Sequence, residues 1–104
     1  MYKTGAEAAK YIEQLKKLLT PDSRVDVTLA PSFTALGAAR EAAQGSSISI
    51  AAQNVFWEEE GAFTGEISPA MLTSMGIKQV IIGHSERRQF FGETDETVNR
   101  RVKA

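Results

Sequence analysis

The sequence has no cysteine and only one histidine among its 104 residues. The absence of cysteine excludes a disulfide framework, a thiolate nucleophile and a cysteine-ligated metal. A lone histidine also argues against a zinc site of the usual ligation. We therefore expect no disulfide, no cysteine chemistry and no zinc site of the usual kind.

Strong charge and long apolar runs are also missing. The formal net charge is −1, which gives no reason to expect a nucleic-acid or membrane-surface partner. The basic residues of the C-terminal part (Arg87, Arg88, Arg100, Arg101 and Lys103) are explained by positions near helix ends. No apolar run is long enough to span a bilayer, and the N-terminus does not resemble a signal peptide. We expect a soluble cytoplasmic protein whose residues 1–104 form a single domain.

The first predicted element is an amphipathic helix over residues 6–19, where apolar residues recur at helical spacing. Thr4 and Glu7 have the T-x-x-E spacing of a capping box at its start. Pro21-Asp22 is expected to end the segment.

The rest of the chain alternates strands with helices. Strands are predicted at residues 25–29, at 48–52 with a continuation to Val55, and at 79–82. The last is so apolar that burial on both faces is expected. Helices are predicted at residues 33–44, from Ser68-Pro69 to Gly76, from a Ser85 cap through Phe91, and after a Thr94 cap. This order is typical of right-handed βαβ units in a parallel α/β sheet. Three such strands leave two unpaired edges, as in a piece of something larger or a protomer that associates.

The candidate chemistry lies where parallel strands end, because ligands of α/β folds bind there. Three groups follow predicted strands: Pro31-Ser32-Phe33, Gln53-Asn54-Val55 and Gly83-His84-Ser85-Glu86. The helix dipole beyond His84 disfavours an imidazolium, so a neutral ring could donate a hydrogen bond to a substrate oxygen. Such a group stabilises an enediolate, which a sugar-phosphate isomerase requires. The alternative is a histidine satisfied by neighbouring backbone groups, without chemistry.

Two other features leave alternatives open. Glu86 could steady a cation or the surroundings of His84, or could simply complement the helix dipole. Trp57 and Phe63, in the loop after the second strand, could anchor a contact with another chain or pack locally.

Four stretches resemble one known family, the triosephosphate isomerases. The stretch 51–55 followed by 61–68 (AAQNV, then GAFTGEIS) resembles the family's third strand and interface loop, and 80–88 (VIIGHSERR) resembles the signature around its catalytic histidine. Residues 91–96 (FGETDE) continue the match, and 29–31 (LAP) resembles the end of the second strand. The resemblance covers essentially the whole chain.

The resemblance implies roles for individual residues. His84 would be the neutral electrophile that polarises the substrate carbonyl, an established role in that family. Glu86 would support the active-site lysine, and Ser85 would cap the short helix aimed at the site. Thr64 would reach into a partner subunit. The structural and dimer-facing network around it would include Gln53, Asn54, Gly65, Glu66, Arg87 and Arg88.

The resemblance also implies a reaction and a fold. The family interconverts dihydroxyacetone phosphate and glyceraldehyde 3-phosphate through an enediolate, in glycolysis and gluconeogenesis, without metal or organic cofactor. The fold would be a partial (β/α)8 barrel containing strands two to four with helices one to four. The substrate would be a triose phosphate, and the partner another copy of the chain or a complementary barrel fragment.

The match also lacks parts of the family pattern. The family's substrate-binding asparagine and lysine would precede Met1, and its base glutamate, lid loop and phosphate site would follow Ala104. We therefore expect the isolated chain to be inactive, with its substrate-binding residues unassigned. A non-catalytic, self-assembling half-barrel module is the main alternative. A free-standing doubly wound domain would leave the match around Gly83 to Glu93 unexplained.

Overall fold

The computed structural model describes residues 1–20 and 24–104, which divide into two compact units. Unit 1 comprises residues 1–52 and unit 2 comprises residues 53–104. The predicted end of the first helix at Pro21-Asp22 lies outside the described residues. Within the described ranges, no helix is long and apolar enough to cross a membrane.

Unit 1 begins with helix α1 (Gly5–Leu18), which starts one residue before the predicted range. The predicted capping box is confirmed. The Thr4 amide donates to Glu7 Oε2 at 2.7 Å, and the Glu7 amide donates to Thr4 Oγ1 at 3.4 Å. These reciprocal bonds satisfy amides that a helix start otherwise leaves without partners.

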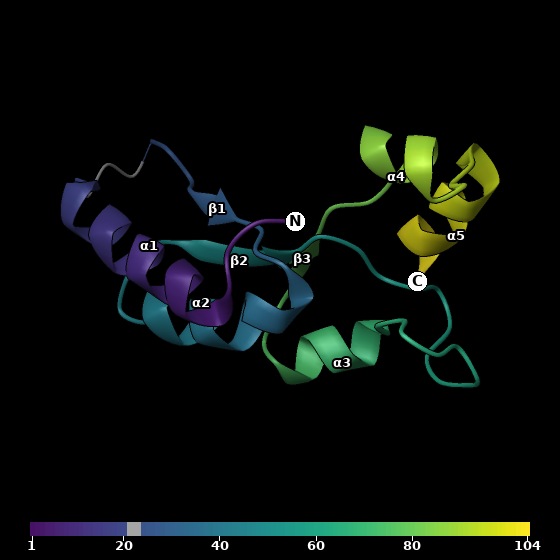
Figure 1. The fold of residues 1–104 in the computed structure, drawn as a ribbon, viewed down its shortest axis with the longest axis horizontal. Helices are drawn as coiled ribbons and strands as arrows, with labels where there is room; N and C mark the ends of the chain where they lie inside the picture. Colours follow the sequence, from purple (N-terminus) through teal and green to yellow (C-terminus); the bar gives the residue numbers. More distant parts are fainter. Residues whose placement is uncertain (21–23) are drawn as a thin grey trace. The chain divides into compact units, whose positions relative to one another are not determined.

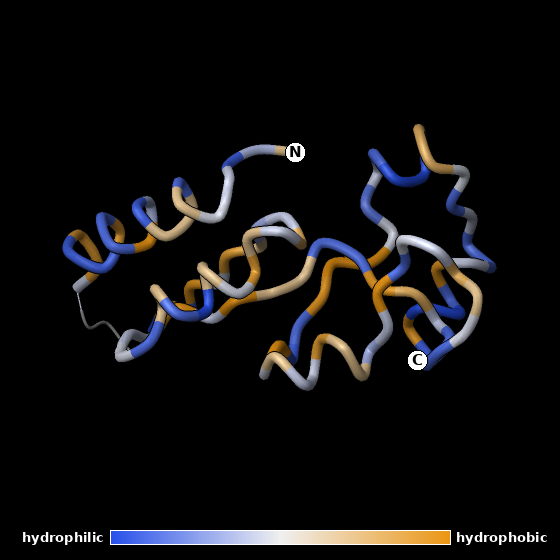
Figure 2. The backbone as a smooth tube through the Cα atoms, turned by 60° about the horizontal axis from the view of Figure 1, so that its bottom comes forward, coloured by the Kyte–Doolittle hydropathy of each residue, from blue (hydrophilic) through white to orange (hydrophobic). Residues whose placement is uncertain are grey.

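Helix α1 lies beside α2 (Leu36–Ala43), which follows the short 3₁₀ helix η1 (Phe33–Ala35) (Figure 1). The core between them contains Ile12, Ala39, Ala43 and Ile48, all buried. Hydrophilic and hydrophobic residues alternate along α1, as expected for a helix with one buried face (Figure 2). The small alanine side chains of α2 let the two helices approach closely.

Strands β1 (Thr28–Leu29) and β2 (Ser49–Ala52) pair in parallel, with Thr28 opposite Ser49 and Leu29 opposite Ile50. Because α2 connects them, unit 1 contains a βαβ unit, as predicted. The first strand is shorter than the predicted range 25–29, and Val25 is 65% exposed. The difference arises because a strand's length depends on its ladder partner, and this ladder spans two residue pairs.

Unit 2 contains α3 (Pro69–Ser74), β3 (Gln79–Val80), α4 (Ser85–Phe90) and α5 (Asp95–Lys103). The predicted N-caps of α3 and α5 are confirmed. Ser68 accepts from the Met71 amide at 3.3 Å, and Thr94 accepts from the Thr97 amide at 3.3 Å. Gly76 follows α3 with φ at 72°, the left-handed conformation common just after a helix.

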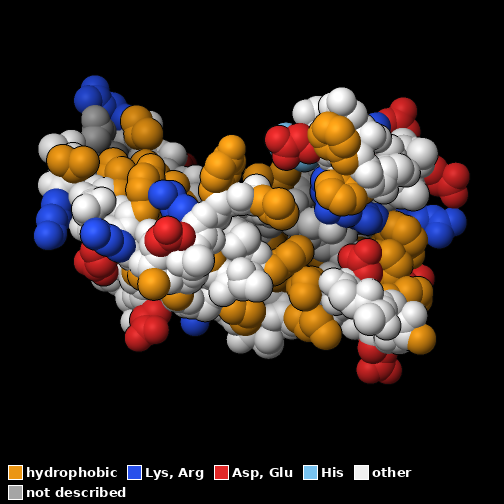
Figure 3. Space-filling view, in the orientation of Figure 1, with side chains coloured by type: hydrophobic (Ala, Val, Ile, Leu, Met, Phe, Trp, Pro, Cys, Tyr) orange, Lys and Arg blue, Asp and Glu red, His pale blue; other side chains and the backbone are white. Residues whose placement is uncertain are grey.

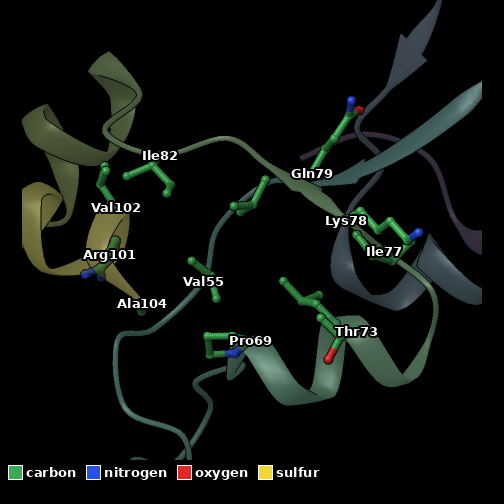
Figure 4. A pocket seen from close by; sticks show the side chains of 12 residues that line it. Val55, Pro69, Thr73, Ile77, Lys78, Gln79, Ile82, Arg101, Val102 and Ala104 are labelled. Carbon is green, nitrogen blue, oxygen red and sulfur yellow. The ribbon is translucent and has the colours of Figure 1, made fainter.

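The prediction of a third strand buried on both faces is wrong for this chain. β3 spans two residues instead of four, Gln79 is exposed, and Ile81 is 39% exposed. An apolar sequence makes burial favourable, but covering both faces requires neighbouring elements, which the residue pattern cannot specify. One side of this segment opens onto an apolar pocket of about 200 Å³, lined also by α3 and α5 (Figure 4).

Candidate active site

His84 lies at the start of α4, immediately after a glycine turn. Gly83 has φ at +69°, which a glycine adopts at little cost, and His84 is extended with φ −55° and ψ 143°. The amides of Arg87 and Arg88 donate to the His84 carbonyl oxygen at 2.9 and 3.2 Å. These bonds fix the histidine backbone in the N-cap position of α4.

The histidine side chain itself caps the helix, which corrects the prediction that Ser85 does so. His84 Nδ1 accepts a hydrogen bond from the Glu86 amide at 3.2 Å. Imidazole Nδ1 is as many bonds from the backbone as the side-chain oxygen of asparagine, so it can reach the same amide. Ser85 is instead the first residue within the helix.

This hydrogen bond determines which ring nitrogen carries the proton. A nitrogen that accepts from an amide has no hydrogen, so a neutral ring must carry its proton on Nε2. The Glu86 carboxylate is 3.8 Å from Nδ1, too far for a hydrogen bond, so the shorter amide contact decides the tautomer. With 48% of the side chain exposed, the Nε2 side can meet a ligand. A proton on Nε2 is what the ring needs in order to donate a hydrogen bond to a substrate oxygen.

Glu86 contributes to the site mainly through its backbone. Its amide holds the imidazole, whereas its side chain is 74% exposed and lies on the Nδ1 side of the ring. Within the part of unit 2 that the structure describes, this is the one carboxylate recorded beside the histidine ring. The carboxylate therefore cannot orient the ring as strongly as the amide does.

Behind α4 lies a buried ionic cluster centred on Glu93, which the sequence patterns did not single out. Arg87 Nε donates to Glu93 Oε1 at 2.6 Å, and Arg101 Nη2 lies 3.2 Å from the same oxygen. Arg101 Nε also donates to Asn54 Oδ1 at 3.3 Å. No sequence signal marks Glu93 as buried, because it stands in a hydrophilic stretch just before a helix cap.

The guanidinium of Arg101 is also covered by aromatic rings. It lies 4.8 Å from the ring centre of Trp57 and 5.9 Å from that of Phe56. Phe56 packs in turn against Phe63, with ring centres 4.7 Å apart. Trp57 and Phe63 therefore pack locally within unit 2, and a contact with another chain remains a prediction.

The predicted interface residues differ in their burial and in their contacts. Asn54 is buried and Arg87 half-buried, and the Glu93 cluster joins them. Thr64 and Gly65 are exposed on the loop before α3, where Gly65 has φ at 90°. The other two, Glu66 and Gln53, are half-buried and exposed, respectively. An interface formed by these residues stays a prediction.

A metal centre has no candidate ligands in the parts of the chain that the structure describes. Over residues 1–20 and 24–104, no group of three or more histidine or acidic side chains could hold an ion.

Comparison with known proteins gives a consistent result. The family model described as triosephosphate isomerase matches residues 1–104. The chain is 55% identical over 104 residues to the triosephosphate isomerase of Carboxydothermus hydrogenoformans, and 57% identical to that of Citrifermentans bemidjiense. The protein of the same name from Geobacter metallireducens is 53% identical. Each alignment covers the whole chain but 41% of the relative, so the chain spans less than half their length.

Proposed function

This chain belongs to the triosephosphate isomerase family, and on that premise we propose that His84 supplies the electrophile for isomerisation of a triose phosphate. The fold is the corresponding α/β segment of that family's barrel. The observation that carries the proposal is the bond from the Glu86 amide to His84 Nδ1, because it leaves the Nε2–H as a donor.

The proposed chemistry is polarisation of the substrate carbonyl. His84 Nε2–H donates to the carbonyl oxygen and stabilises the negative charge that develops there as a proton leaves the adjacent carbon. A base that this chain does not supply takes that proton and returns a proton to the former carbonyl carbon, while the hydroxyl proton passes from one enediolate oxygen to the other, which interconverts dihydroxyacetone phosphate and glyceraldehyde 3-phosphate. No residue of this chain is assigned as the base, and Glu93 is held between two arginines.

Glu86 has two proposed parts in this site. Its amide orients the imidazole, and its exposed carboxylate is available to hold a cationic side chain beside the substrate. The family reaction requires a base and a substrate-binding cation acting together with the histidine. We therefore propose that the 104-residue chain alone does not turn over substrate.

A chimera tests these proposals. The matching segment of the Carboxydothermus hydrogenoformans protein is replaced by this chain, and isomerase activity is measured beside the isolated chain. The chimera should be active, and its His84→Gln variant should lose about 10²–10³-fold in kcat, as when one preorganised oxyanion donor is removed. The isolated chain should show no more activity than an identically purified His84→Ala preparation. An active isolated chain, or a chimera insensitive to His84→Gln, would contradict the proposals.

We further propose that the chain acts in the cytoplasm and associates, either with copies of itself or with a complementary barrel fragment. Support comes from the large apolar side chains that remain exposed in unit 2, including Phe90, Phe91 and Val102. The predicted interface residues Thr64 and Gly65 are also exposed. The same apolar surface is what a non-catalytic assembling module would use, so the chimera separates the two functions.

A further inference from the structure

We infer that Arg88 is a positioning residue for His84, acting through the carbonyl oxygen of Gly83. Arg88 Nε donates to that oxygen at 3.0 Å, and Arg88 Nη1 donates to Asp95 Oδ1 at 2.6 Å. One guanidinium thus connects the peptide that leads into His84 with the first turn of α5. The effect of Arg88 on the His84 ring is independent of the proposed function, and only its effect on isomerisation rests on that function.

The Gly83 carbonyl is a sensitive point because it belongs to the peptide unit that joins Gly83 to His84. The peptide is planar, so holding its oxygen limits rotation about the bonds on either side. Those bonds include φ of His84, which must stay near −55° for Nδ1 to meet the Glu86 amide. Release of the carbonyl would therefore loosen the side-chain cap and, with it, the tautomer preference.

A side chain of α5 also lies close to the turn. A methyl group built on Gly83 would lie 3.0 Å from Val98 Cγ2 and 3.3 Å from Arg88 Nη2. The Arg88 guanidinium and a side chain of the last helix therefore both crowd the side of Gly83 where a Cβ would lie. Arginine suits this place because its planar fork can serve two acceptors at once, which the single ammonium of lysine does less well.

The exposure of Arg88 and Asp95 determines how much their ion pair can contribute to stability. Arg88 is 39% exposed and Asp95 is 97% exposed, so the ion pair itself adds little to global stability. The bond to the Gly83 carbonyl acts locally on a single peptide. We therefore expect Arg88 substitutions to change the histidine ring more than they change the unfolding of unit 2.

The test uses the fact that His84 is the only histidine, so its ring nitrogens give unique signals in the ¹⁵N-labelled 104-residue chain. Long-range ¹H–¹⁵N spectra, recorded where the ring is neutral, distinguish the acceptor Nδ1 from the protonated Nε2. In wild type the two nitrogens should be well separated. In Arg88→Met, the ratio of Nε2–H to Nδ1–H tautomer should fall about threefold to tenfold, the effect of losing one modest hydrogen bond.

Three companion variants define the control. Arg88→Lys keeps one donor and should retain most of the wild-type ratio. Asp95→Asn weakens the ion pair but leaves the carbonyl bond, so its effect should be smaller than that of Arg88→Met. Glu96→Gln removes a comparable exposed pair with Arg100 on α5 and should leave the ring signals unchanged.

Folding is monitored in each variant by the fluorescence of Trp57, the only tryptophan. If Arg88→Met unfolds unit 2, Arg88→Gln takes its place under the same criterion. Wild-type ring signals in a folded Arg88→Met or Arg88→Gln variant would overturn the positioning role. The readout needs no turnover, so an inactive chimera would overturn the proposed function and leave this inference standing.

Discussion

At the scale of single residues, Glu93 shows how much of unit 2 depends on one side chain. It is buried, with two guanidinium groups directed at the same oxygen. Its other oxygen, Oε2, and Arg101 Nη1 are buried without a hydrogen-bond partner among the described residues. Such a cluster tolerates the loss of its central charge poorly, because the remaining positive charges stay out of water.

We predict that Glu93→Gln lowers the free energy of unfolding of unit 2 by about 2–3 kcal/mol, since Arg87 and Arg101 lose their shared counter-charge. Glu96→Gln is the matched control, because Glu96 pairs with Arg100 at an exposed site and should cost less than about 0.5 kcal/mol. Urea unfolding followed by Trp57 fluorescence measures both. Equal small effects would show that the cluster does not hold unit 2 together.

Gly83 gives a second prediction at this scale. Alanine there must adopt φ near +69° and also crowd Val98, whereas alanine at Gly92 meets the same kind of φ, +66°, in open space. Gly92→Ala should cost about 1 kcal/mol, the ordinary penalty of that conformation. Gly83→Ala should cost at least about 1 kcal/mol more, because its methyl group has no room. Urea unfolding of the two variants isolates the packing contribution, and equal costs would contradict it.

At the scale of elements, helix α1 carries a pH-sensitive start. The Thr4 amide, followed by the Thr4 hydroxyl, hydrogen-bonds the Glu7 carboxylate and lowers its pKa from the ordinary value of 4.5. Because the folded-state pKa is the lower one, the stabilisation is complete above pH 4.5. It is then lost as the pH falls through the folded-state pKa.

We predict that the helicity of α1 decreases in that acidic range, because a protonated Glu7 accepts more weakly from the Thr4 amide. Circular dichroism at graded pH measures the change, and the ¹³C signal of the Glu7 carboxyl group reports the pKa directly. Thr4→Ala removes the hydroxyl and should bring the pKa of Glu7 part of the way back towards 4.5. Glu7→Gln should abolish the acid step attributable to this site. A Glu7 pKa at the ordinary value in wild type would refute the prediction.

The elements also show which features can be predicted from sequence. The predicted caps at Thr4, Ser68 and Thr94 are confirmed. They can be predicted from the sequence because each capping bond joins residues that are three positions apart. The cap at His84 is equally local, but histidine is not among the residues that usually cap helices, so the sequence favours Ser85 instead. Strand lengths were overestimated because pairing depends on distant partners.

The candidate site divides in the same way. Residue type and position marked His84 and the neighbouring Glu86. The burial of Glu93 and Arg101 depends on contacts with residues distant in the sequence. For example, Arg101 donates to Asn54, which lies 47 residues earlier in the chain. No local pattern distinguishes these two charges from the exposed ones around them. The long-range part of the site therefore required the structure.

At the scale of the whole molecule, exposed apolar side chains and a small net charge both favour association between copies of the chain. Hydrophobic side chains are visible on the surface of both units, between charged ones (Figure 3). Phe90 is 67% exposed, and Tyr2 is 89% exposed. A net charge of −1 gives little repulsion between copies, so buried apolar area can drive association.

We predict that the pure chain self-associates with rising concentration and that Phe90→Gln shifts it towards monomer. Phe90 is the better position than Phe91, whose ring lies 5.0 Å from the Arg87 guanidinium and whose loss would disturb the ionic cluster as well. Tyr2→Gln is the matched control, because it removes one exposed aromatic ring from unit 1. Sedimentation velocity across a concentration series distinguishes the outcomes. If Phe90→Gln and Tyr2→Gln reduce association equally, the association is non-specific and uses apolar side chains of both units. If only Phe90→Gln acts, the surface of unit 2 is the contact, and a monomeric wild type would exclude assembly.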